Sequence, residues 1–306
     1  MRNSGFGIPA LCLLLAGCGG SGESVTSTPP PPPPPAATPL PLTASASFET
    51  ITSAMTYSEP PTGSGSFGSL QAGPRGPAIS FSYDAASGTY NVQGNGVSAS
   101  FGQTDQIPDT SYSDTFSKTI GNASDSVKLY GNARSDTPGT PPVVLSYTSY
   151  GIWTHSDNAT GQTSKTYFVY GQPTGAANMP VTGTASYQMT ASAHMYPGGV
   201  GTASTRILGT ATLNANFGTG AIDTVLKFGG TYSGTGTISA DQFSGTFTTQ
   251  DPSALNGSFF GGFFGPGAKE AGYTFQIHIH VSDPYAGAAI QPPDTYIAGA
   301  AVGTKG

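Results

Sequence analysis

Two histidines, His278 and His280, carry the clearest potential for chemistry because they stand two residues apart in the alternating run Tyr273–Val281. Residues i and i+2 of a β-strand point to the same side, so both imidazoles are expected on one face. Two imidazoles could chelate a metal ion given a third ligand, or bind haem. The alternative is a pair of exposed polar residues, with the opposite face turned inward. That face carries Tyr273, Phe275, Ile277, Ile279 and Val281.

Two further patterns resemble ligand sites but do not fit their requirements. Asp105, Asp109 and Asp114 lie in one polar loop and could collect a calcium ion, yet their spacing matches no EF-hand loop. Gly63–Gly68 matches G-x-G-x-x-G, but Pro60 and Pro61 precede it and no strand–helix unit surrounds it. A dinucleotide site needs that context, so both patterns are interpreted as loops.

Three isolated residues are interpreted as structural. His155 and His194 have no partner histidine or cysteine nearby in the sequence. Trp153 is the only tryptophan and lies near the junction of two β-rich regions. It is expected to fill a core or an interdomain contact, and a ligand platform is the alternative.

No motif for catalysis is present. The sequence contains no G-x-S-x-G elbow and no H-E-x-x-H pair. Its two cysteines, Cys12 and Cys18, precede the body of the chain, which excludes a thiol nucleophile, a disulfide framework and a cysteine metal site there. We predict a protein that is not an enzyme and has no cofactor. A hydrolase with a serine triad hidden in a β scaffold is a remote alternative.

The composition is that of a folded, strand-rich and weakly charged protein. Only 8% of the 306 residues are charged, the net charge is −6 and no Lys/Arg cluster occurs, which argues against nucleic-acid binding. Gly (44) and Pro (26) are abundant. Aromatic residues at 10%, with frequent Val, Ile and Thr, nevertheless indicate β-structure.

The first eighteen residues have the features of a lipoprotein signal peptide. Arg2 supplies the positive charge, and the apolar run Gly5–Leu15 is too short to span a bilayer as a helix. Leu15–Cys18 (LAGC) resembles the bacterial lipobox, which implies that residues 1–17 are removed and that Cys18 is acylated. Gly19 follows where an inner-membrane lipoprotein commonly carries Asp, so outer-membrane sorting is expected. The alternative is an ordinary cleaved signal with an incidental cysteine.

Residues 18–43 are predicted to form a tether. Pro29–Pro35 is an unbroken run of prolines, which adopts polyproline II and acts as a semi-rigid spacer. A proline-rich ligand for a recognition domain is the other interpretation. The spacer suits a chain anchored at Cys18.

Two β-rich regions follow the tether. Residues 44–178 contain short alternating runs between turn residues, such as Ile79–Tyr83 and Val97–Phe101, with helix confined to a turn near Ser47–Ala54. Residues 179–306 contain eight longer runs with short connections, which force antiparallel neighbours and favour an up-and-down barrel filled by side chains. The eight runs are Val181–His194, Ala203–Phe217, Ala221–Phe228, Thr231–Ser239, Gln242–Thr248, Leu255–Phe264, Tyr273–Val281 and Tyr296–Val302. The predicted fold class is all-β.

The stretch Ser258–Phe275 (SFFGGFFGPGAKEAGYTF) pairs two aromatic doublets across two glycines. Its second half is expected to form one helical turn over Ala268–Ala271, with Gly272 at the C-terminal cap. The aromatic residues are expected to fill the barrel. They are Phe260 and Phe264, or Phe259 and Phe263, depending on whether the glycines form a bulge.

The same stretch resembles the signature of the transferrin-binding protein B β-barrel domain, Gly-Gly-Phe-Tyr-Gly-Pro-x-Ala-x-Glu-x-Gly-Gly-x-Phe. Phe264 replaces the usual Tyr, and Tyr273 stands where the second Gly is common. The resemblance extends over about residues 165–281. The matching residues are Gly261, Gly262, Phe263, Phe264, Gly265, Pro266, Ala268, Glu270, Gly272 and Phe275.

This resemblance implies a handle-like β domain (44–178) followed by an eight-stranded barrel (179–306). Members of the family are mostly surface lipoproteins of Gram-negative bacteria that capture host transferrin, haemoglobin or complement regulators, or partner TonB-dependent receptors. The chain has length for one lobe, so it is similar to the single-lobe relatives. The expected protein is bound to the lipid bilayer at the outer membrane, exposed at the surface, and captures a protein or a haem/iron ligand. The alternative is an accessory envelope lipoprotein with no role in iron uptake.

Overall fold

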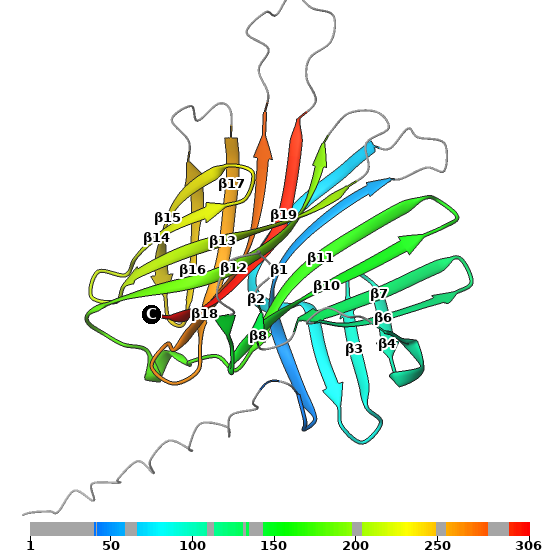
Figure 1. Cartoon of the computed structure of the whole chain (residues 1–306), viewed down its shortest axis with the longest axis horizontal. Helices are drawn as coiled ribbons and strands as arrows, with labels where there is room; N and C mark the ends of the chain where they lie inside the picture. The colour runs from blue at the N-terminus through cyan, green and yellow to red at the C-terminus, as the bar shows by residue number, and fades with distance from the viewer. Residues whose placement is uncertain are drawn as a thin grey trace, which may run out of the picture. The chain divides into compact units, whose positions relative to one another are not determined.

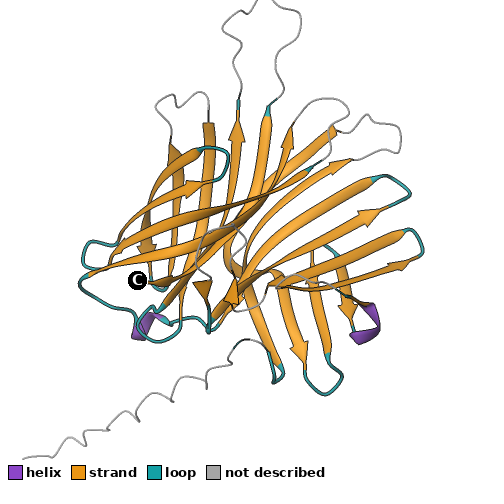
Figure 2. Cartoon of the chain, in the orientation of Figure 1, coloured by secondary structure: helices purple, strands orange, loops and turns teal. Residues whose placement is uncertain are grey.

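The computed structural model describes residues 40, 42–58, 66–108, 113–130, 133–134, 143–197, 204–248, 255–280 and 294–306. The proposed signal peptide, Cys18 and the proline run therefore lie outside the described residues. Within the described ranges, no helix is long and apolar enough to cross a membrane. Ala37–Gly306 form one compact unit. Strands dominate the described part, with two short 3-10 turns, η1 (Gln103–Asp105) and η2 (Ala176–Asn178) (Figure 2).

The N-terminal half builds a nine-stranded antiparallel sheet in the order β4-β3-β2-β1-β11-β10-β7-β6-β5. A separate ribbon pairs β8 (Ala133–Arg134) with β9 (Val143–Val144). The strands of the sheet are β1 (Ala46–Ser58), β2 (Ser66–Asp84), β3 (Thr89–Gly94), β4 (Val97–Phe101), β5 (Gln106–Ile107), β6 (Ser113–Ile120), β7 (Ala123–Tyr130), β10 (Thr148–Asp157) and β11 (Gln162–Gly171).

The helical turn expected near Ser47–Ala54 is wrong, because this segment lies within β1. Alternate residues of β1 are buried on opposite sides: Ile51 packs toward the barrel, whereas Phe48 packs into the sheet's own core. A strand buried on both faces loses the simple alternation of apolar and polar residues, and with it the sequence signal for a strand.

The sheet curls until its two ends almost meet, so that it encloses a core of its own. Phe101 of β4 and Phe116 of β6 lie 6.4 Å apart between ring centroids, and Lys118 donates a hydrogen bond to the carbonyl of Ser100. The enclosed core consists mainly of Ile79, Phe81, Val92, Phe101, Phe116, Val127, Leu129, Trp153, Phe168 and Tyr170.

The C-terminal half is a closed eight-stranded antiparallel barrel, as predicted (Figure 1). Each strand pairs with the next in sequence, and β19 closes the circle against β12. The strands are β12 (Thr184–Pro197), β13 (Thr205–Asn216), β14 (Ala221–Lys227), β15 (Thr231–Ser239), β16 (Gln242–Thr248), β17 (Leu255–Phe264), β18 (Glu270–Ile279) and β19 (Thr295–Lys305).

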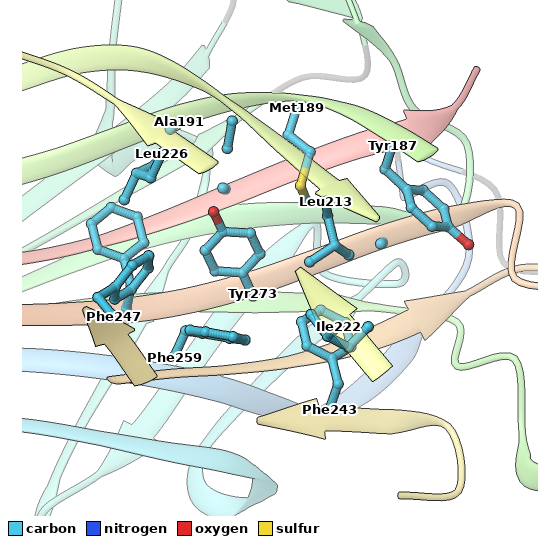
Figure 3. Packing of buried hydrophobic residues seen from close by; sticks show 14 of the residues in the cluster. Tyr187, Met189, Ala191, Leu213, Ile222, Leu226, Phe243, Phe247, Phe259 and Tyr273 are labelled. Carbon is cyan, nitrogen blue, oxygen red and sulfur yellow. The ribbon is translucent and has the colours of Figure 1, made fainter. Parts of the chain in front are cut away.

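Side chains fill the barrel, so its interior is a core rather than a ligand pocket. Tyr273 stands among Phe259, Phe247 and Leu226 in Figure 3, and its hydroxyl lies 3.1 Å from that of Thr224. Glycine makes room for the large rings: a Cβ on Gly245 would lie 2.4 Å from the ring of Phe259. An eight-stranded barrel is just wide enough for such filling.

One face of the nine-stranded sheet packs against the barrel. Ile51 and Val169 of the sheet share an apolar cluster with Val302 of β19. The hydroxyl of Ser53 donates to the backbone carbonyl of Phe275 at 2.7 Å. These contacts attach β1 and β11 to β18 and β19; β18 carries the last signature residues and His278.

Candidate functional site: the signature hairpin and an imidazole face

The signature residues form the hairpin between β17 and β18, and the expected helical turn is wrong. Gly265, Gly267 and Ala268 have φ values of 72°, 63° and 57°, which a right-handed helix does not permit. β18 already begins at Glu270. Gly272 lies inside that strand rather than at a cap, and a Cβ there would come 2.8 Å from Cγ1 of Val169. Glycine is thus needed there for the close approach of sheet and barrel.

The aromatic doublets divide their side chains between the barrel interior and the cluster between sheet and barrel. Phe259 and Phe263 belong to the barrel interior, which decides between the two alternatives for barrel filling. Phe260 and Phe264 pack instead in the cluster between sheet and barrel. The hairpin therefore packs on both faces, against the barrel interior and against the sheet.

Glu270 connects the hairpin to the segment that enters β10. Its side chain is buried, with the residue 1% exposed, and its carboxylate accepts backbone hydrogen bonds from Ser146, Tyr147 and Thr148 at 2.7, 2.9 and 2.9 Å. Burial raises the pKa of Glu270, and the three hydrogen bonds oppose that rise. With its oxygens engaged by backbone donors, Glu270 holds two segments together.

His278 and His280 both reach one carboxylate at the start of β19. Nε2 of His278 lies 2.8 Å from Oδ2 of Asp294, and Nδ1 of His280 lies 2.7 Å from Oδ1. The hydrogen bond to His278 is the main cause of a lowered pKa of Asp294. Among the described residues, no group of three or more His, Cys, Asp or Glu side chains could hold a metal ion. The imidazoles engage opposite oxygens of the carboxylate instead.

An aromatic stack continues this cluster. The ring of His278 lies on that of Tyr296, with centroids 4.6 Å apart, and Tyr296 stacks on Phe67 at 3.5 Å. The His278 and His280 side chains remain 36% and 53% exposed. We refer to His278, His280, Asp294, Tyr296 and Phe67 as the imidazole face. It lies where β18 ends and β19 begins, at the upper end of these strands in Figure 1.

The acidic loop and the glycine-rich motif do not form ligand sites in the described residues. Asp105 accepts a hydrogen bond from the backbone N–H of Gly102 at 2.9 Å, and Asp114 accepts one from the side chain of Gln106 at 3.3 Å. Asp109 lies outside the described residues. Of the motif Gly63–Gly68, only residues 66–68 are described, and they lie in β2.

The two isolated histidines have internal partners. Nδ1 of His194 lies 2.8 Å from the hydroxyl of Tyr167, and burial lowers the pKa of His194 to about 3. Nδ1 of His155 lies 2.9 Å from Oδ1 of Asp125, which also accepts a hydrogen bond from Nε1 of Trp153 at 3.0 Å. Trp153 is buried in the sheet's own core.

Sequence reasoning missed Asp294 and Asp125. Each is an isolated carboxylate in its own stretch of sequence, far from the histidine that it contacts. Pairing β18 with β19 brings Asp294 to the histidines, and pairing β7 with β10 places Asp125 opposite His155. Only knowledge of that register could have identified either contact.

Comparisons with known proteins agree with this architecture. Residues 179–292 match the family model described as the C-lobe and N-lobe beta barrels of Tf-binding protein B. Among curated proteins, none matches the sequence.

Several solved structures match this chain at low sequence identity. Intact Ap-TbpB (N and C lobes) is 11% identical and has a TM-score of 0.43, with 86% of this chain and 78% of that chain covered. A TbpB mutant from Actinobacillus pleuropneumoniae H49 is 13% identical with a TM-score of 0.42 and coverage of 85% and 100%. HpuA from Kingella denitrificans, in complex with human haemoglobin, is 14% identical with a TM-score of 0.41 and coverage of 86% and 87%. Residues 179–292, which contain strands β12–β18 of the closed barrel, are thus similar to the β-barrel domains of transferrin-binding protein B.

Proposed function

We propose that this protein is a lipid-anchored binding protein of the outer membrane that captures a host protein or an iron-containing ligand. The observation that carries the proposal is the match of residues 179–292 to the barrels of Tf-binding protein B. Because side chains fill the barrel, capture must use external surfaces. Cys18 would supply the lipid anchor, residues 18–43 the tether, and a TonB-dependent receptor is a candidate partner at the cell surface.

The imidazole face is the surface that we assign to capture. An imidazole nitrogen is a common axial ligand of haem iron, and His280 is the more exposed of the two histidines. Tyr296 and Phe67 provide flat rings beside it, and aromatic side chains often carry much of the energy of a protein interface. Asp294 holds the imidazoles in position for either ligand.

A binding assay tests this assignment. The purified protein is offered human haemoglobin, human transferrin and immobilised haem, and we expect retention of at least one of them. The double variant His278→Ala/His280→Ala should lose that retention at least tenfold. The matched control is Asp223→Ala/Lys227→Ala, which removes two exposed side chains from β14 on the same barrel. Undiminished binding by the histidine variant would move the capture surface elsewhere, and no retention of any ligand would favour an accessory role in the envelope.

Surface exposure needs a separate experiment. Protease added to intact cells should cleave the protein if it faces outward. Protection on intact cells, combined with cleavage after permeabilisation, would contradict capture at the surface while leaving the binding assay unaffected.

A further inference from the structure

The nine-stranded sheet contains a polar cleft that is separate from the imidazole face. Its volume is about 310 Å³, and a smaller hollow of about 130 Å³ continues it, since the two share Ala54, Gln71, Asn95 and Thr166. The larger part is lined by residues of β1, β2, β10 and β11 and by the hairpin of β3 and β4. Ligand pockets commonly have volumes of about 300 Å³ or more and are found in the mouths of barrel-like sheets.

Strand register arranges most of these residues in two lateral rows across β2, β1, β11 and β10. Each row is a set of directly paired residues that share one face of the sheet. The outer row is Ser69, Thr56, Ser164 and His155. The inner row is Gln71, Ala54, Thr166 and Trp153. Ala54 is the smallest side chain of the eight and stands in the middle, which leaves space above it.

The rows lie on the inward face of the sheet, where an apolar core would ordinarily continue. Trp153 and Phe168, the next inward residue after Thr166 on β11, both belong to the sheet's apolar core. On β11, the inward-facing side chains therefore change from aromatic at Phe168 to polar at Thr166. Thr166 is 2% exposed and Trp153 is buried, whereas Gln71 is exposed, so the inner row runs from the interior of the sheet to the open side of the cleft.

Buried Asp125 holds both rings of the cleft wall. Its Oδ1 accepts from Nε1 of Trp153 at 3.0 Å and lies 2.9 Å from Nδ1 of His155. If Nδ1–H of His155 donates to the carboxylate, the neutral imidazole presents Nε2 as an acceptor. The opposite wall is the turn between β3 and β4, where Asn95 has a φ of 53°.

The chemistry of the lining defines the ligand class. Hydroxyl, amide and imidazole groups supply both donors and acceptors, and no Lys, Arg, Asp or Glu lines the cleft. A buried ionic ligand would lack an opposite charge, which is costly, whereas hydroxyl groups could satisfy this lining. We propose that the cleft binds an uncharged, hydroxyl-rich small molecule of the size of a mono- or disaccharide.

Binding can be measured by the fluorescence of Trp153, because it is the only tryptophan in the sequence and lies in the cleft wall. The full chain is titrated with galactose, N-acetylglucosamine and maltose, and with glucuronate as a charged counterpart. We expect a saturable change in tryptophan fluorescence with at least one neutral sugar and a response at least tenfold weaker to glucuronate. The absence of a response to every neutral sugar up to 50 mM would overturn the assignment.

Variants separate binding in the cleft from indirect effects. Ala54→Leu fills the space between the rows and should weaken the response at least tenfold, while Gln71→Ala keeps the space but removes an amide and should weaken it less. Ala221→Leu, at an exposed position on β14, is the matched control and should bind normally. Circular dichroism during heating confirms that each variant is folded. A folded Ala54→Leu variant that binds as tightly as the wild type would also contradict the proposal, and neither result depends on capture at the imidazole face.

Discussion

The carboxylate of Glu270 shows what the signature residues do at the scale of one side chain. It lies in the barrel strand β18, yet all three of its backbone donors belong to the segment that enters β10 of the sheet. Burying this carboxylate is costly, as its raised pKa indicates. The three N–H groups would nevertheless be left without acceptors if it were removed, and each unsatisfied buried donor costs about 1–3 kcal/mol.

Replacing Glu270 tests this role. In Glu270→Gln one oxygen becomes an NH2 group that faces backbone donors, so we expect the free energy of unfolding to fall by about 2–4 kcal/mol, given about 1.5–3 kcal/mol for each hydrogen bond to a charged group. Urea unfolding measures the change. Glu49→Gln, which alters an exposed glutamate of β1, is the control and should change stability by less than about 0.5 kcal/mol. Equal effects of the two variants would contradict the bridging role.

At this scale, the sequence predicted a contact only where the contacting residues are close together in the chain. The same-side placement of His278 and His280 followed from their spacing, and both side chains do reach Asp294. The carboxylate itself, fourteen residues beyond His280, gave no local signal. Contacts made across strands require the register, which hydrophobic alternation alone does not specify.

At the scale of elements, the barrel strands were predictable because eight runs follow one another with short connections. Observed β15, β16 and β17 have the predicted bounds. The hairpin between β17 and β18 was not predictable, because Ala268–Ala271 are good helix formers and local propensity favours a helix. Ala268 instead adopts a φ of 57° in the turn that joins the paired strands β17 and β18, so strand pairing overrides local helix propensity there.

Two glycines of this hairpin offer a matched comparison. Both Gly265 and Gly267 have positive φ, so an alanine at either position costs about 1–2 kcal/mol. Only at Gly265 would the new Cβ meet a neighbour, the ring of Tyr147 at 2.5 Å, whereas the space at Gly267 is open. We therefore expect Gly265→Ala to destabilise the protein by about 1–3 kcal/mol more than Gly267→Ala, the usual cost of overpacking. Urea unfolding of the two variants measures this difference. Equal losses of unfolding free energy would show that Tyr147 moves aside freely.

At the scale of the whole compact unit, sheet and barrel are joined by polar contacts as well as by apolar ones. Nη2 of Arg75, in β2, lies 2.7 Å from Oδ1 of Asp241, in the turn between β15 and β16. Oδ2 of Asp241 also accepts a hydrogen bond from the backbone N–H of Gly175 at 3.2 Å, in the connection from sheet to barrel. One carboxylate thus contacts the sheet, the connection and the barrel. The apolar cluster gives the two halves a broad contact, and this ion pair adds a charged one.

The last prediction concerns that ion pair. Both side chains are largely buried, so removing either partner leaves an uncompensated charge, at a cost of about 3–5 kcal/mol. We expect Arg75→Met and Asp241→Asn each to lower the free energy of unfolding, and the double variant to lose less than the sum of the two. A coupling energy of about 0.5–3 kcal/mol is typical of residues in direct contact. The exposed pair Asp223→Asn and Lys227→Met on β14 should be additive. Additive losses at Arg75 and Asp241 would show that the two side chains are not energetically coupled, and would contradict a role of this ion pair in holding the sheet on the barrel.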